Sequence, residues 1–225
     1  LRNIFAAGAN KFLPLGFKGR NWASSLGTNF SKSIPHNNIF FDDNDIESLI
    51  GREMSTFNSK IIRENLINKN YEDIVQRSTR YDFKNYMCED ILVKVDRSSM
   101  LNSLEMRSPF LDKDVIEYAF KYVPSWMKAT SKDRKIILRM LSDKLLPKNF
   151  DSSRKQGFSI PLKEWLKTRE WKSLINSYLL DESSIFNHNQ VKKIIKYQDF
   201  GLSNSERIFG LLIFEIWRKK YKVTL

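Results

Sequence analysis

Apolar residues recur at helical spacing in almost every segment of this chain, and this pattern constrains its fold more than any other feature. The i, i+3, i+4 recurrence predicts helices over residues 43–52, 90–102, 112–122, 131–145, 161–166 and 203–221. Few segments alternate as strands do, and the βαβ rhythm of a nucleotide-binding sheet is missing. A mainly α fold is predicted.

Three of these helices carry start signals. Asp112 can cap the helix through Tyr122, and Ser131 can cap the helix through Leu145. Residues 203–206 read Ser-Asn-Ser-Glu, a capping box that would open the last helix. The residues predicted to face inward on that last helix are Phe209, Leu212, Ile213, Ile216 and Trp217.

The length and composition indicate a globular protein. With 225 residues, 41% of them hydrophobic, the chain can bury a core as one large domain or two small ones. The single cysteine, Cys88, excludes an internal disulfide and suits a reducing compartment. No signal-peptide pattern occurs, and the longest apolar run, residues 208–217, is about half of a ~20-residue membrane span. We therefore expect a cytoplasmic protein without a membrane partner.

The net charge of +12 is concentrated in one part of the chain. Residues 119–175 hold 14 Lys and Arg against 5 Asp and Glu, an excess of nine. A basic region of this kind can meet nucleic acid or a polyphosphate ligand. A solvated, lysine-rich surface is the alternative.

Within this basic region, Lys132, Lys135 and Arg139 lie three and four residues apart at the start of a predicted helix. Cations in a first turn oppose the helix dipole, at about 0.3–1 kcal/mol each, and only Asp133 offsets them. The arrangement is favourable if an anion binds there. Plain solvated lysines are the competing interpretation.

Residues 147–160 form a stretch of about fourteen residues with little periodicity, which is typical of a functional or disordered loop. Arg154 and Lys155 precede Gly157, and two cations beside a glycine could fold over a phosphate group. A loop without a role explains the pattern equally well.

Asp96 stands among Leu92, Val93 and Met100 on its predicted helix. A carboxylate buried there without a partner would cost several kcal/mol, so we expect a cationic or hydrogen-bonding partner. The candidates nearby in sequence are Lys94, Arg97 and Arg107. An ion network that only orients the helix is the alternative to a functional role.

No metal or phosphate loop is apparent in the sequence. His36 and His188 are far apart and lack metal-ligand spacing, and Cys88 reads as a small apolar residue. None of the eight glycines is adjacent to another or separated from one by a single residue, so no glycine-rich phosphate loop occurs.

Ordered motifs over about ninety residues resemble the glutamine-hydrolysing asparagine synthase family. The blocks in the first part of this stretch are Asp82, Asp90-Ile-Leu-Val-Lys-Val-Asp-Arg97, Ser99-Met100, Ser103-Leu-Glu105, Arg107 and Pro109-Phe-Leu-Asp112. Those that follow are Lys135-Ile-Ile-Leu-Arg139, Leu146-Pro147, Arg154-Lys155, Gly157-Phe158, Pro161 and Trp165-Leu166.

The resemblance implies a ligase that activates the aspartate side chain with ATP and Mg²⁺, and then transfers ammonia made from glutamine by a separate glutaminase domain. It implies Lys135 as the catalytic lysine of the synthetase site. The residues expected at the phosphates or pyrophosphate are Arg139, Arg154 and Lys155. The residues expected to scaffold the site are Asp96, Arg97, Glu105 and Arg107.

Two parts of the family pattern are missing from the chain. The Ser-Gly-Gly-x-Asp loop that binds ATP and the amino-terminal cysteine of the glutaminase do not occur, and the first residue is Leu1. We therefore expect residues 1–225 to be a single helical region with a signature core at 81–170. This region would be the carboxyl-terminal portion of an α/β, PP-loop-type synthetase domain whose parallel sheet lies mostly outside the chain, as do the residues that hold Mg²⁺. This fragment alone should be inactive.

Three other functions remain open at this stage. Relatives that make β-lactam rings share the lysine pattern, so the chain could belong to another amidotransferase ligase. A helical module could use the basic region to bind nucleic acid, although the resemblance disfavours it, or the chain could be an interaction domain without chemistry. A homodimer is one assembly open to the full-length protein.

Overall fold

The computed structural model describes residues 6, 8–9, 11–29, 34, 39–51, 73–147, 149–150 and 160–224. These residues form helices joined by turns, and the only β pairing among them is the isolated bridge between Ala129 and Arg134. The mainly α prediction is confirmed. No described helix is long and apolar enough to cross a membrane.

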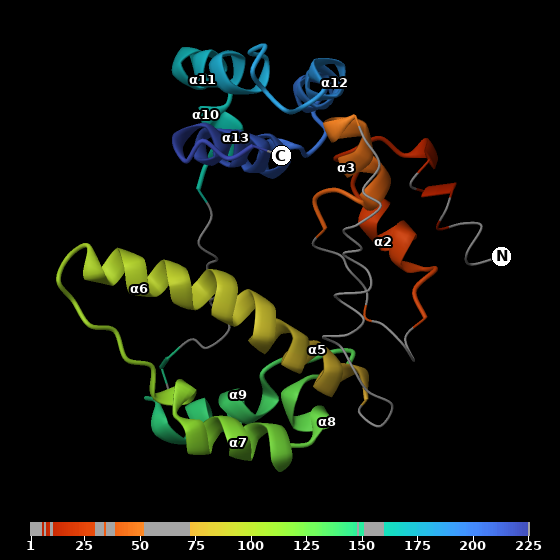
Figure 1. Cartoon of the computed structure of the whole chain (residues 1–225). Coiled ribbons are helices and arrows are strands. Elements are labelled where there is room, and N and C mark those ends of the chain that lie inside the picture. The colour runs from red at the N-terminus through yellow and green to blue at the C-terminus, as the bar shows by residue number, and fades with distance from the viewer. Residues whose placement is uncertain are drawn as a thin grey trace. The chain divides into compact units, whose positions relative to one another are not determined.

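The chain divides into two compact units (Figure 1). Unit 1 comprises Leu1–Thr28, Pro35–Lys60 and Phe158–Leu225, and unit 2 comprises Asn29–Ile34 and Ile61–Gly157. The helices of unit 1 are α2 (Arg20–Ser25), α3 (Asp43–Ile50), α10 (Leu162–Trp165), α11 (Arg169–Leu179), α12 (His188–Asp199) and α13 (Ser205–Lys220).

Unit 1 encloses an apolar core contributed mainly by α11, α12 and α13. Its fully buried members include Leu179, Val191 and Leu212, and Leu49 of α3 joins the same cluster. Phe186, in the turn before α12, closes the cluster between the helices. Burial of these side chains is the main favourable term for this unit.

Polar side chains are buried beside this core, and several of them have defined partners. Arg20 pairs with Asp42 at 3.0 Å and with Asp45 at 3.1 Å, and the two acids also form the capping box of α3. Asn204 is fully buried and donates to the carbonyl of Leu15 at 2.9 Å. These bonds offset the cost of removing the polar groups from water.

The buried Asn204 also explains a glycine. Gly16 has φ +84°, and a Cβ atom there would lie 2.5 Å from the Asn204 amide nitrogen. Both the left-handed backbone and the close approach therefore require glycine at this position.

Unit 2 is built on a long helical rod with three shorter helices on one side of it (Figure 1). The rod runs without a break through α5 (Ile74–Asp82), the π-helical stretch η1 (Phe83–Leu92) and α6 (Val93–Met100). The remaining elements are η2 (Pro109–Leu111, a 3₁₀ turn), α7 (Lys113–Lys121), α8 (Ser125–Lys128) and α9 (Ile136–Leu145). The helix predicted over 90–102 is thus confirmed, and it belongs to a longer rod.

Two of the predicted helix starts differ from the structure. Asp112 does cap α7, accepting from the backbone N–H groups of Asp114 and Val115. The helix predicted from Ser131 begins only at Ile136, because the Thr130 hydroxyl accepts the amides of Lys132 and Asp133 and holds them in a turn. The capping box at residues 203–206 is also wrong, since Asn204 precedes α13 and its side chain is engaged elsewhere.

The face that α13 buries was predicted only in part. Leu212 is buried as expected, but Ile213 and Trp217 are 46% and 45% exposed. The buried face instead includes Ile208, Leu211 and the fully buried Glu215. A count of apolar residues missed this face because Glu215 is paired with Arg218 at 2.7 Å, which permits its burial.

Candidate functional site

Lys135 has the most unusual backbone among the sequence-predicted site residues that the structure describes. It has φ 56° and ψ 37°, the left-handed region, and it directly precedes α9. This conformation costs a non-glycine residue about 1–2 kcal/mol. Such strain is found most often where the surrounding structure enforces it, as at functional sites. The side chain of Lys135 is exposed and therefore accessible to a ligand.

The start of α9 lacks the usual side-chain cap. Its N-cap residue, Lys135, makes no side-chain cap bond among the described residues, and no acidic residue lies in the first turn. The first N–H groups of a helix have no acceptor within the helix and carry the positive end of its dipole. An anion is the natural partner for such a terminus, and Lys135 adds a full positive charge beside it.

Arg139 lies one turn into α9, near Lys135. Its backbone N–H donates to the Lys135 carbonyl at 2.9 Å, and its guanidinium meets the Asp133 carboxylate at 3.4 Å. Lys132 lies in the preceding turn and not on the helix, so the three-residue basic stripe predicted from the sequence is wrong. Two cations, Lys135 and Arg139, remain at the helix start, and Asp133 is the ion-pair partner of Arg139.

Glu105 and Arg107 pair with each other in the segment between α6 and η2. The distance from the Arg107 guanidinium to the Glu105 carboxylate is 2.7 Å, and both side chains are largely exposed. An exposed pair of this kind contributes about 0–1 kcal/mol to stability. It therefore fixes the local orientation of two side chains more than it stabilises unit 2.

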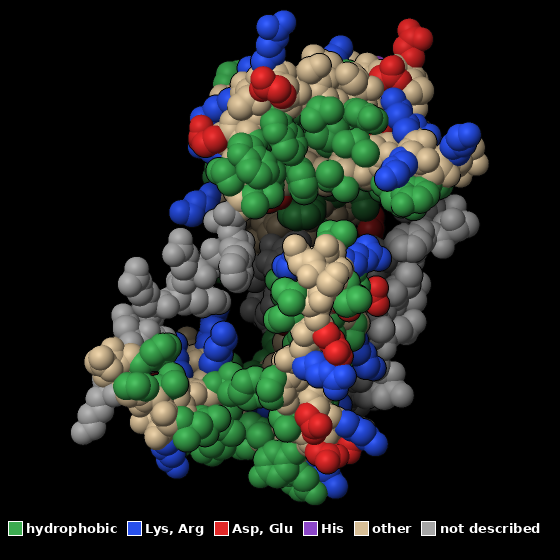
Figure 2. All heavy atoms as spheres, turned by 90° about the vertical axis from the view of Figure 1, so that its left-hand side faces the viewer, with side chains coloured by type: hydrophobic (Ala, Val, Ile, Leu, Met, Phe, Trp, Pro, Cys, Tyr) green, Lys and Arg blue, Asp and Glu red, His purple; other side chains and the backbone are tan. Residues whose placement is uncertain are grey.

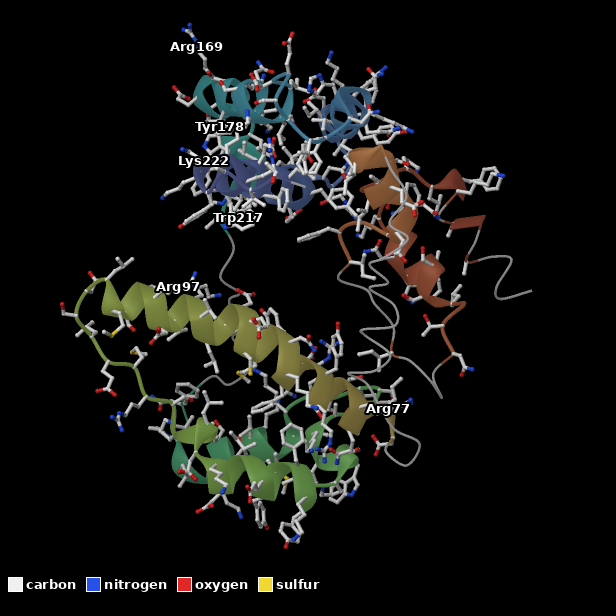
Figure 3. All side chains as sticks on the ribbon, in the orientation of Figure 1. Arg77, Arg97, Arg169, Tyr178, Trp217 and Lys222 are labelled. Atoms are coloured by element: carbon white, nitrogen blue, oxygen red, sulfur yellow. The ribbon has the colours of Figure 1, made fainter. Side chains whose placement is uncertain are left out.

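Asp96 and Arg97 lie on α6 and are exposed. Arg97 points away from the layer formed by α7, α8 and α9 (Figure 3). Within the described residues, Asp96 makes no side-chain hydrogen bond or ion pair, so the expected buried and paired aspartate is wrong. The reason is that the described elements of unit 2 do not pack over that side chain.

The structure thus does not link all the predicted site residues. Among the described residues, no hydrogen bond or ion pair joins Lys135 or Arg139 to the four predicted scaffold residues. Arg154 and Lys155, predicted at the pyrophosphate, lie outside the described residues.

The described part of the chain also holds no cluster of three or more His, Cys, Asp or Glu side chains suited to a metal ion. A Mg²⁺ ion therefore has no set of ligands among these residues.

Sequence reasoning missed the residues that hold the Lys135 turn in place. Gln76 on α5 and Lys128 on α8 are bonded side chain to side chain although they are 52 residues apart. No local pattern marks such a pair. The one sequence feature near this pair is Pro124, which directly precedes the short helix α8 that carries Lys128.

Comparison with known proteins identifies the family. The Asparagine synthase family model matches residues 23–219. Asparagine synthetase (glutamine-hydrolyzing) 1 of Bacillus subtilis (strain 168) is 33% identical over 149 residues, which cover 65% of this chain and 23% of that protein.

Two further relatives come from Mycobacterium bovis and Mycobacterium tuberculosis (strain H37Rv) and are provisionally named glutamine-hydrolyzing asparagine synthetases. Each is 30% identical to this chain over 153 residues. Those residues cover 64% of this chain and 22% of each of these proteins. The chain thus spans less than a quarter of the length of the curated relatives it matches. No solved structure gives a significant match. Because the family model spans most of the chain, the chain belongs to the asparagine synthase family.

Proposed function

We propose that this chain supplies one wall of the synthetase site in an ATP-dependent ligase that converts aspartate to asparagine. Family membership and the names of the relatives support the reaction class. The observation that carries the site is Lys135, an exposed cation held in a left-handed conformation before an uncapped helix.

The proposed chemistry has two steps. The aspartate side-chain carboxylate attacks the α-phosphorus of ATP, which forms an acyl-adenylate and releases pyrophosphate. Ammonia from glutamine then attacks the acyl carbon, and AMP leaves with the bonding electrons. Negative charge develops on the phosphate oxygens in the first step and on the carbonyl oxygen in the second.

The contribution of this chain is electrostatic. Lys135 and the first N–H groups of α9 would face the developing negative charge, and one such preorganised donor is worth about 2.7–4 kcal/mol in the transition state. Arg139, Arg154 and Lys155 would bind the phosphates or the departing pyrophosphate. Asp96, Arg97, Glu105 and Arg107 would shape the wall of the site.

The proposed enzyme also needs parts that this chain would not supply. The ATP loop, the Mg²⁺ ligands and the glutaminase domain would be supplied outside this chain. A cytoplasmic location belongs to the same proposal.

The test uses the complete protein as its gene encodes it. Lys135→Ala should lower pyrophosphate release dependent on ATP and aspartate by about 10²–10³-fold, because a transition-state cation is lost. Glutamine hydrolysis should continue, since it depends on a separate domain. Lys121→Met, which removes an exposed lysine from the end of α7, is the control for lost charge and should keep its activity. Unchanged pyrophosphate release in Lys135→Ala would overturn the proposal.

A further inference from the structure

The turn that carries Lys135 is closed by two backbone hydrogen bonds, one inside the turn from the Thr130 N–H to the Asp133 carbonyl and one at its ends between Lys135 and Lys128. The Lys135 N–H donates to the Lys128 carbonyl at 2.8 Å, and Ala129 and Arg134 form a β-bridge within the same turn. Residues 128–135 therefore form a closed loop whose first residue, Lys128, is bonded to its last, Lys135. The position of Lys128 therefore bears directly on the left-handed backbone of Lys135.

The side chain of Lys128 fixes this junction to the helical rod. Its ammonium donates to the Gln76 side-chain carbonyl on α5 at 2.8 Å and lies 5.2 Å from the centre of the Phe120 ring. The Gln76 amide nitrogen in turn donates to the Val123 carbonyl at 3.3 Å. The one side chain of Gln76 thus holds the chain both before and at the end of α8.

The other end of α8 is attached to the same turn of α5. The Ser125 hydroxyl donates to the Asp73 carboxylate at 2.5 Å, and Asp73 is the N-cap of α5. The helix α8 is only four residues long and could not hold an orientation by itself. It is fixed because its first and last residues both bond to α5.

From this chain of contacts, we infer that Lys128 is a positioning residue for the proposed reaction, acting through the turn on Lys135, with Gln76 as its support. The inference rests on the proposed role of Lys135. Lys128 is half-buried and its ammonium is occupied by Gln76 and Phe120, so it orients the site without touching substrate. Its loss would let the loop relax and move the Lys135 ammonium from the position in which it meets the phosphates.

The expected effect falls on kcat. A displacement of about 1 Å at a reacting centre can cost on the order of 10²-fold in rate. Lys128→Met keeps the aliphatic stem beside Phe120 and removes the ammonium. In the complete protein it should lower kcat for pyrophosphate release by about 10–100-fold, with KM for ATP and aspartate changed less than threefold. Lys128→Arg, which keeps a donor near Gln76, should recover a substantial part of the loss.

A double-mutant comparison separates positioning from general structural damage. If Lys128 acts only through Lys135, Lys128→Met should produce no further loss in a Lys135→Ala background. A purely structural role would lower the residual activity again and would give no rescue by arginine. Lys121 is the matched control, because its ammonium lies 5.0 Å from the Tyr122 ring but has no bond to the Lys135 turn. Lys121→Met should leave kcat within twofold.

The outcomes are distinguishable. If Lys135→Ala leaves pyrophosphate release intact, the proposed function is wrong and this inference falls with it. If Lys135→Ala is inactive but Lys128→Met keeps kcat within twofold, only the positioning role of Lys128 is wrong. Should Lys128→Met fail to fold, Gln76→Ala tests the same bond from the other side and should lower kcat in the same range. Full activity in Gln76→Ala would then overturn the inference.

Discussion

Units 1 and 2 hold their helices together in different ways. Unit 1 surrounds a cluster of buried apolar side chains, among them Leu179 and Leu212, whereas Val123 is the one buried apolar residue among residues 73–147 of unit 2. In unit 2, Leu101 is 86% exposed and Leu145 is 72% exposed. The described contacts of unit 2 are instead polar and aromatic, such as Lys128 with Gln76 and Phe83 with Phe120.

Exposed apolar side chains gather in green areas on the visible faces of the molecule (Figure 2). Those of unit 2 come from the end of the rod, the segment after it, η2, α7 and α9, and they include Met100, Leu104, Phe110, Tyr118 and Leu141. The contrast between the two units teaches that the family motifs of residues 82–139 lie on a framework in which few apolar side chains are buried among the described residues. Unit 1 supplies stability of its own, while unit 2 supplies the charged turn.

The comparison is tested most strongly by removing equivalent volume from each unit. Leu212→Ala should destabilise unit 1 by about 2–5 kcal/mol, because it leaves a cavity in a closed core. Leu141→Ala should cost unit 2 less than about 1 kcal/mol, because that side chain is 44% exposed. Hydrogen exchange of the complete protein, read separately at α13 and α9, measures both effects. Equal losses of protection would show that both units depend on comparable cores.

Lys135→Gly sharpens the contrast between stability and chemistry within unit 2. The left-handed backbone at this position suits glycine, so relief of strain offsets the extra entropy of the unfolded chain. We expect stability to hold or to rise by up to about 1 kcal/mol, while pyrophosphate release falls by about 10²–10³-fold. Hydrogen exchange at α9 and an assay of pyrophosphate release measure the two quantities. If Lys135→Gly instead unfolds unit 2, so that lost stability accounts for the lost pyrophosphate release, a site role for Lys135 is contradicted.

The smallest expected effect concerns the polar attachment of α8 and its pH dependence. The hydrogen bond from the Ser125 hydroxyl, helped by the backbone N–H groups of Val75 and Gln76, holds the pKa of the Asp73 carboxyl below its ordinary value of 3.8. A lowered pKa in the folded state means that this stabilisation is complete above the unfolded value and is lost as the pH falls through the folded value.

Ser125→Ala should therefore destabilise α5 and α8 by about 0.5–1 kcal/mol at pH 6. Below the folded pKa of Asp73 the variant and the wild type should converge. Hydrogen exchange at α5, compared between pH 6 and pH 3, gives the measurement. An effect of the same size at both pH values would show that the Asp73 carboxylate is not the partner that matters.

Much of the secondary structure could be predicted from sequence because its signals act within one helical turn. Asp112 caps α7 through amides two and three residues ahead, and apolar spacing over residues 90–102 located the last part of the rod, including α6. The basic charge near α9 and the choice of Lys135 also came from sequence, the first from composition and the second from family motifs. These properties need no knowledge of distant residues.

Long-range contacts decided the rest. The left-handed residue Lys135 is bonded through its N–H to Lys128, and the Lys128 side chain is bonded to Gln76, 52 residues away along the chain. The burial of Glu215 depends on the pairing geometry with Arg218 and on the amide of Ile185. Helix periodicity and caps report interactions within a few residues, whereas backbone strain and buried charge arise only when distant segments meet. The amino-acid sequence thus determined which segments are helical and where the basic charge lies, and the tertiary structure determined how the backbone at Lys135 is held.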